Sequence, residues 1–193
     1  MMRKFYATLF LLSSLISLKS IAQEAADFYA IIDGVSEELI KADITTLAGF
    51  GTRHTLSDTL SQSRGIGAAR RWIFNEFQEI AKTCKGCLEV SYQKNYQEPD
   101  ERRIVKPVWI NNVVAIQKGT KYPNRFIIMS GDIDSRISDS NNYTDDSPGA
   151  NDNASGMAGT IEAARVLSNY SFENSIIYTG LAGEEQGLFG GAG

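Results

Sequence analysis

Five carboxylate side chains in the second half of the chain stand where they could hold a cation. Asp132 and Asp134 follow the short apolar run 126–129, and Glu184 and Glu185 follow the apolar run 175–181. Asp152 lies between these two pairs, at the start of a helical pattern. Carboxylates gathered on one rim repel one another unless a cation neutralises them. The pattern therefore predicts a metal site built mainly from acidic residues.

The spacing of these carboxylates predicts different roles for them. Asp132 and Asp134 are two residues apart, so an extended backbone projects both to the same side, where one can bind a metal and the other can support it. Glu184 and Glu185 are adjacent and diverge, which suits one carboxylate on the metal and one acting as a base. Asp152 could lie between two cations and neutralise both.

The overall composition excludes several other chemistries. The 193 residues include a single histidine, His54, which excludes a His-rich metal site within the chain and leaves one possible base for Ser-His-Asp chemistry. The polar segment around His54 favours a local hydrogen bond over a role in a substrate cleft. With a formal charge of -4 and no long Lys/Arg run, the chain is not expected to bind nucleic acid.

The elements around the carboxylates predict an α/β domain. A buried strand at 126–129, a helix at about 154–168 and a second buried strand at 175–181 follow one another, an order typical of a layered domain with a largely parallel inner sheet. Ligands of such sheets bind beyond the carboxyl ends of the strands. The upstream pattern predicts a helix over Asp27–Phe50 with Ile32, Val35 and Leu39 on one face, an amphipathic helix from Gly65 with Ile66, Ala69, Ile73, Phe77 and Ile80 inward, and strands at Leu88–Tyr96 and Val108–Ile116.

Three ordered motifs resemble one known family. Gly131–Ser135, Pro148–Gly156 and Gly183–Leu188 look like the motifs of the co-catalytic dizinc exopeptidases, which include bacterial leucyl aminopeptidase and aminopeptidase Y. The similarity extends over roughly residues 45–193. It implies a three-layer α/β sandwich with a mostly parallel central sheet, and a metallopeptidase that acts on peptides or proteins with a free N-terminus. Dipeptidase, carboxypeptidase and glutaminyl cyclase relatives share the same motifs.

The resemblance also implies a role for each carboxylate. Asp152 matches the residue that bridges two zinc ions, and Glu185 matches a ligand of one of them. Glu184 matches the general acid/base that takes a proton from water and passes it to the leaving amine. Asp134 matches the carboxylate that orients a neighbouring ligand. The implied cofactors are therefore two Zn²⁺ ions, typically about 3.5–4 Å apart.

Two departures from the family pattern affect this expectation. Asp132 stands where the family usually has histidine; it is retained as a metal ligand, and its added negative charge could admit Mn²⁺ or Co²⁺. The family also supplies a further Asp and a His after the residue matched by Glu185, and this chain carries neither. We therefore expect residues 23–193 to be the N-terminal portion of one catalytic domain, inactive when isolated.

The first 22 residues predict export. Arg3 and Lys4 precede the apolar stretch Phe5–Leu18, and Ser20 and Ala22 suit a cleavage site before Gln23. The pattern predicts a signal peptide over residues 1–22, a secreted or periplasmic protein, and no stable membrane insertion after cleavage.

Cys84 and Cys87 have the C-x-x-C spacing of redox and zinc-binding motifs. A zinc knuckle would need a second pair of ligands, and a thioredoxin-like motif would follow a strand rather than a helix. A structural disulfide in an oxidising compartment is therefore favoured.

Two alternative functions stay open at this point. Asn151–Gly156 with Glu162 approaches a calcium-binding EF-hand loop, although position one is Asn and Pro148–Gly149 precludes an entering helix. The other alternative is a catalytically inactive homologue of the same fold that only binds a ligand, an idea favoured by Asp132 and opposed by Glu184.

Overall fold

The computed structural model describes residues 28–100 and 102–192 and divides the chain into two units after Val35. In the first unit, residues 28–33 form a short helix that ends at a turn at Gly34. The expected signal peptide lies outside the described residues. Within the described part of the chain, no helix has the length and apolar character needed to cross a membrane.

Helix α2 of the second unit is shorter than the sequence pattern predicted. It spans Glu37–Gly49, and Ser36 caps it because the Ser36 Oγ accepts a hydrogen bond from the Leu39 backbone N–H at 3.2 Å. The single helix predicted over Asp27–Phe50 is therefore wrong. The predicted apolar face is also wrong, since Leu39 is 45% exposed and Leu47 is the apolar residue that α2 buries.

Helix α3 spans Gly65–Thr83 and confirms the predicted amphipathic pattern. All five residues predicted to face inward are buried: Ile66, Ala69, Ile73, Phe77 and Ile80. They pack against strands β1 (Leu88–Gln97) and β2 (Val108–Gln117). Burying one such aliphatic or aromatic side chain contributes about 1.5–3 kcal/mol, so this face anchors α3 to the sheet.

The central sheet is mixed rather than mostly parallel. Its order is β1-β2-β4-β3, where β3 is Tyr122–Asp132 and β4 is Asn174–Leu181. β1 and β2 pair antiparallel, as do β2 and β4, and β3 pairs parallel with β4. The ten-residue connection between β1 and β2 favours an antiparallel pair, because a parallel pair needs a longer crossover. Helix α4 (Ser155–Leu167) provides such a crossover between β3 and β4.

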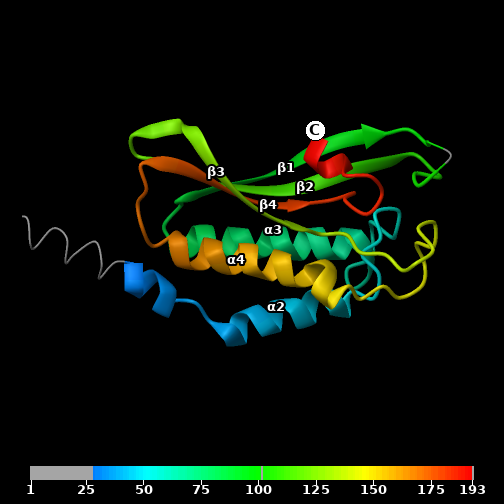
Figure 1. Ribbon diagram of the computed structural model, residues 1–193, viewed down its shortest axis with the longest axis horizontal. Helices are drawn as coiled ribbons and strands as arrows, with labels where there is room; N and C mark the ends of the chain where they lie inside the picture. Colours follow the sequence, from blue (N-terminus) through cyan, green and yellow to red (C-terminus); the bar gives the residue numbers. More distant parts are fainter. Residues whose placement is uncertain (1–27, 101, 193) are drawn as a thin grey trace, which may run out of the picture. The chain divides into compact units, whose positions relative to one another are not determined.

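The helices that pack on the sheet, α3 and α4, lie along one of its faces (Figure 1). α3 packs under β1 and β2, α4 (Ser155–Leu167) packs under β3 and β4, and α2 packs against α4. The α/β class is thus confirmed, and the expected layering is present on this face.

Strand β3 is the edge of the sheet, which the sequence pattern did not predict. Phe126, Ile127 and Ile128 are 52%, 54% and 64% exposed. The short apolar run was expected to be a buried inner strand. That prediction is wrong for these side chains, because no strand in the described residues pairs with the outer side of β3.

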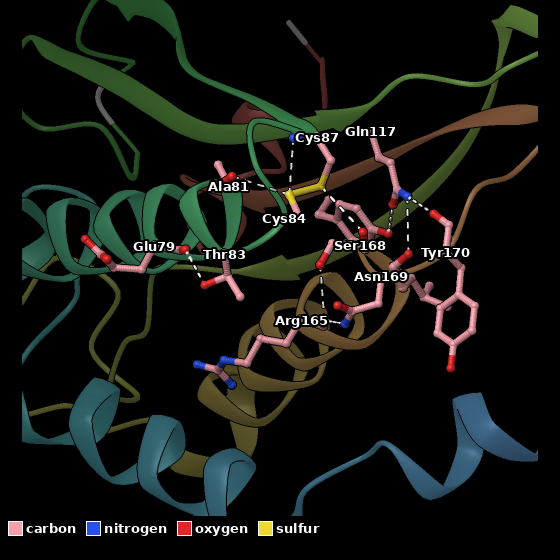
Figure 2. Close-up of a disulfide and its surroundings, with 12 residues drawn as sticks. Glu79, Ala81, Thr83, Cys84, Cys87, Gln117, Arg165, Ser168, Asn169 and Tyr170 are labelled. Carbon is pink, nitrogen blue, oxygen red and sulfur yellow. Dashed lines mark hydrogen bonds between the residues drawn. A yellow bond between two sulfur atoms is a disulfide. The ribbon is translucent and has the colours of Figure 1, made fainter.

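The two cysteines form a disulfide where α3 ends and β1 begins (Figure 2). The connecting turn places Lys85 and Gly86 at positive φ, and the Gly86 N–H donates to the Ala81 carbonyl at 2.7 Å. Cys87 Sγ lies 3.6 Å from the carbonyl oxygen of Ser168, just after α4. The disulfide therefore fixes a turn that also contacts the end of the neighbouring helix.

Removing the disulfide should cost moderate stability. A four-residue loop constrains the unfolded chain little, so the double variant Cys84→Ser/Cys87→Ser should lose about 2 kcal/mol of unfolding free energy. Urea denaturation of the variant and of the reduced wild type measures the loss, and the two should agree. Equal stability of oxidised and reduced wild type would contradict the expectation.

Candidate metal centre

The parallel pair β3 and β4 brings the acidic motifs to one edge of the sheet. Asp132 pairs in register with Leu181, and the Ile133 N–H continues the ladder by donating to the Leu181 carbonyl at 2.7 Å. A Cβ on Gly131 would lie 2.4 Å from the Met157 nitrogen, so the first turn of α4 sits directly over the strand end. Glycine permits this close approach. The strand ends and the start of α4 thus converge.

Asp132 is held by the loop that precedes α4. Its Oδ2 accepts a hydrogen bond from Asn153 Nδ2 at 2.8 Å, and Asn153 Oδ1 accepts one from the Gly156 N–H at 2.9 Å. Asn153 therefore links Asp132 to the first turn of the helix. Asp152 lies one residue earlier, exposed, with extended backbone angles of φ −119° and ψ 96°. Its carboxylate is free of hydrogen bonds to other described residues.

Asp134 is buried and organises the loop that carries the two glutamates. Its carboxylate accepts hydrogen bonds from the Thr55 hydroxyl at 2.8 Å and from the backbone N–H groups of Glu184 and Glu185 at 3.2 Å each. Burial raises the pKa of Asp134 to about 6, while these three hydrogen bonds oppose the rise. These contacts tie Asp134 to Thr55 and to the backbone of both glutamates, and its orienting role stays a prediction.

Glu184 lies in a field of negative charge. Burial first, and then the carboxylates of Asp132, Glu185 and Asp152, raise the pKa of Glu184 above its usual value, and Arg136 opposes the rise. Arg136 Nε also donates to Glu185 Oε2 at 2.6 Å in a half-buried ion pair. Each of the three expected metal ligands therefore acts on the expected base.

The donors fit a divalent cation in charge and in chemistry, because oxygen ligands from several carboxylates repel one another without one. The fit is incomplete, however. Among residues 28–100 and 102–192, no three side chains of the His, Cys, Asp and Glu types form a ready-made cation site. A catalytic zinc takes three protein ligands and a water. Asp132, Asp152 and Glu185 could hold metal here only with further donors.

The structure argues against the calcium-binding alternative. Glu162, which would close an EF-hand loop, is buried within α4. Its Oε1 accepts the Ser36 N–H at 2.7 Å, and its Oε2 accepts Arg165 Nη1 at 3.0 Å. A carboxylate committed to these partners cannot also bind an ion in the loop at residues 151–156.

Arg53 supports the site, and the sequence pattern did not single it out. The side chain is 1% exposed and donates to four backbone carbonyls: Leu47 at 2.9 Å, Ile133 at 2.8 Å, Pro148 at 2.6 Å and Gly149 at 3.0 Å. Burial lowers its pKa to about 10, and the nearby Asp134 opposes that shift. Arg53 thus joins the end of α2, the end of β3 and the loop before Asp152.

His54 is fully buried, and its ring makes one local hydrogen bond, as its polar setting predicted, together with contacts to residues distant in the sequence. Its Nδ1 accepts the Leu56 N–H at 3.0 Å, so the ring proton is on Nε2, which donates to the Ser140 carbonyl at 3.0 Å. The Gln186 amide lies 2.8 Å from Nε2. Burial lowers the pKa of His54, and the Ser140 hydrogen bond opposes the shift.

The lowered pKa of His54 predicts a loss of stability in mild acid. Below its unfolded value of 6.5, the unfolded chain binds a proton that the buried ring resists, so the free energy of unfolding falls as pH decreases. The contribution of one group is at most about 1.4 kcal/mol per pH unit. Thermal melts between pH 8 and pH 5 should show a smaller decline for His54→Asn than for the wild type. Parallel declines would contradict this assignment.

Comparison with known proteins supports the resemblance carried by the motifs. Residues 112–193 match the model of peptidase family M28. A probable zinc metalloprotease of Pyrenophora teres f. teres is 48% identical over 161 residues, which is 83% of this chain and 33% of that protein. Another, from Pyricularia oryzae, is 47% identical over 86% of this chain and 33% of that protein. The chain spans about a third of the length of these curated relatives.

Solved structures share the fold. The Legionella pneumophila LapA aminopeptidase superposes with a TM-score of 0.65 at 21% identity, covering 86% of this chain and 38% of that one. A Fimbriiglobus ruber glutaminyl cyclase gives a TM-score of 0.59 at 14% identity, covering 77% of this chain and 45% of that one. Over residues 112–193 this chain is therefore similar to peptidase family M28, and over most of its length it is similar to probable zinc metalloproteases.

Proposed function

We propose that this protein is a secreted or periplasmic zinc-dependent exopeptidase, an aminopeptidase that acts on peptides or proteins with a free N-terminus. The observation that carries the proposal is the setting of Glu184, whose pKa is raised first by burial and then by the carboxylates of Asp132, Glu185 and Asp152. One carboxylate surrounded by three others suits a base beside a cation site. The disulfide supports an oxidising compartment.

The proposal assigns the metal ligands by residue. Asp132 and Asp152 would hold one Zn²⁺ ion, and Asp152 and Glu185 would hold a second. When bound, the two ions supply Lewis acidity that polarises a peptide carbonyl and lowers the pKa of water. The carboxylate of Asp132 also makes Mn²⁺ or Co²⁺ an acceptable occupant.

Glu184 carries the proton transfers in this proposal. Its carboxylate takes a proton from the attacking water and later delivers it to the leaving amine. A raised pKa brings the carboxyl closer to the working pH, where it can both accept and donate a proton. Asp134 holds the backbone of Glu184 and Glu185 and so fixes the direction of both side chains.

The isolated chain should be inactive, because the described residues provide fewer donors than a catalytic zinc requires. The test compares two proteins. One is the chain itself, and the other is a chimaera in which the chain replaces the matching third of the Pyrenophora teres relative. We refer to the second as the completed chimaera.

The completed chimaera should hydrolyse aminoacyl anilides, lose activity to a chelator and regain it with zinc, whereas the chain alone should not hydrolyse them. Cyclisation of an N-terminal glutamine instead of hydrolysis would identify a glutaminyl cyclase, the activity named for several proteins of the same fold. A folded, zinc-loaded chimaera with neither activity would support the binding-only alternative and contradict the proposal.

A further inference from the structure

A cavity of about 1010 Å³ opens where the β1–β2 pair extends past the start of α3. α3 covers one face of this pair as far as Tyr92, whose ring stacks on Phe74 at 4.5 Å. Residues two and four positions further along a strand lie on the same face, so Lys94 and Tyr96 face the cavity beyond the helix. Their partners on β2, Asn111 and Trp109, complete this wall.

The cavity lies at the same edge of the sheet as the candidate metal centre but is lined by different residues. β2 runs antiparallel to β4, with Val113 opposite Gly180, so β2 begins at the edge where β3 and β4 end. None of the expected metal ligands, and not Glu184, lines the cavity. A peptide bound at the metal centre could therefore extend along these strand ends toward the cavity.

The cavity wall is positively charged although the protein is acidic. Arg64, Arg70, Lys94 and Lys106 line it against a single carboxylate, Asp58, in a chain of formal charge -4. The Asp58 carboxylate already accepts two backbone N–H groups within its own loop. Such a concentration of one sign of charge in a concave surface attracts ligands of the opposite sign.

Among the described residues, three of these four cations lack an anionic partner. Arg64 pairs with Asp146 at 2.6 Å. For Arg70, Lys94 and Lys106, no carboxylate of the described residues lies within ion-pair distance. Lys106 instead places its Nζ 4.0 Å from the centroid of the Tyr143 ring. The three cations are therefore available to carboxylates of a ligand.

The cavity also presents aromatic surface, beside a buried asparagine. The rings of Tyr96 and Trp109 lie 5.1 Å apart and are 43% and 57% exposed, so an apolar or aromatic group can pack on them. Asn111 is buried, and its Oδ1 has no hydrogen-bond partner. That oxygen has almost no accessible surface, so the exposed rings of Tyr96 and Trp109 are the part of this wall that a ligand can reach.

We propose that this cavity binds an acidic segment of polypeptide, with its carboxylates at Arg70, Lys94 and Lys106 and an aromatic or apolar side chain on Tyr96 and Trp109. This proposal rests on the proposed function. It adds that the protein prefers peptide substrates with acidic residues away from the cleaved bond. The formal charge of -4 and the absence of a long Lys/Arg run in the sequence favour a peptide over a nucleic acid.

Fluorescence of Trp109 tests the proposal without metal or catalysis. Trp72 is the other tryptophan of the chain, so Trp72→Phe leaves Trp109 as the reporter. The probe is an N-acetylated, C-amidated peptide of alternating glutamate and tyrosine. We expect a saturable change in fluorescence that weakens as salt is added. The same peptide with glutamine in place of glutamate should bind at least roughly tenfold more weakly, since it loses its charge-assisted hydrogen bonds.

Charge variants locate the binding site. Arg70→Gln and Lys94→Gln should each raise the Kd by roughly tenfold, whereas Lys41→Gln, which removes an exposed charge from α2, should leave it unchanged. Lys94 is exposed on a strand, so its variant keeps the test available if Arg70→Gln fails to fold. Circular dichroism of each variant checks the fold.

Several results would overturn the proposal. They are the absence of saturable binding, equal affinity for the glutamine peptide, equal effects of Lys41→Gln and Lys94→Gln, and tighter binding of oligothymidylate than of the acidic peptide. Since the measurement needs no metal, its failure would leave the proposed peptidase function intact. Conversely, an inactive completed chimaera would leave the binding result standing.

Discussion

Replacing Glu184 with glutamine should lower kcat of the completed chimaera by about 10²–10⁴-fold, the usual contribution of a general acid or base. Glutamine keeps the size of the side chain and removes its ability to accept a proton. KM should change little, because the substitution affects proton transfer rather than substrate contacts. Steady-state hydrolysis of an aminoacyl anilide measures both constants.

Measuring the zinc content shows whether the lower kcat of Glu184→Gln comes from lost proton transfer or from lost metal. The Glu184→Gln chimaera should retain the zinc stoichiometry of its parent, whereas Glu185→Gln, which removes an assigned ligand, should lose zinc as well as activity. An active Glu184→Gln enzyme would remove Glu184 from the mechanism. Loss of zinc from it would instead make Glu184 a ligand.

Replacing Arg53 with methionine should destabilise the isolated chain by about 3–5 kcal/mol, because each buried acceptor that loses its donor costs about 1–3 kcal/mol. Methionine fills much of the volume but leaves four backbone carbonyls without their donors: Leu47, Ile133, Pro148 and Gly149. Urea denaturation of the described domain measures the loss directly and requires neither metal nor activity.

The variant Arg53→Lys separates the contribution of the positive charge from that of the hydrogen bonds. Arg53→Lys keeps the charge but cannot reproduce the planar set of donors, so it should still be clearly destabilised. The matched control is Arg102→Met on an exposed turn, which should stay within about 0.5 kcal/mol of the wild type. If Arg53→Met proved no less stable than that control, the network around Arg53 would carry no net stability.

The local sequence pattern predicted the elements whose structure depends on residues close to them in the sequence. The inward face of α3 follows from its three- and four-residue spacing, and the Cys84–Cys87 pair follows from its short separation. The order strand, helix, strand over residues 126–181 predicted the parallel pairing of β3 with β4. That pairing places Asp132 next to the segment that leads to Glu184.

The features that were missed depend on residues far away in the sequence. Nothing near Arg53 indicates that its partners lie up to 96 residues along the chain. The apolar run of β3 has the composition of an inner strand, but the sheet order makes it an edge. The break before α2 depends on one capping residue, Ser36. The helical periodicity of residues 27–50 as a whole does not reveal it. The metal ligands and the base stay predictions.

The exposed edge of β3 has a consequence for handling the protein. Phe126, Ile127 and Ile128 combine bare apolar surface with the unpaired backbone groups of an edge strand, the two properties that promote sheet-to-sheet aggregation. At high concentration, solutions of the isolated chain should become turbid, because the β3 edge of one molecule pairs with the β3 edge of another. A lysine introduced at position 127 should act as a gatekeeper and keep the solution clear.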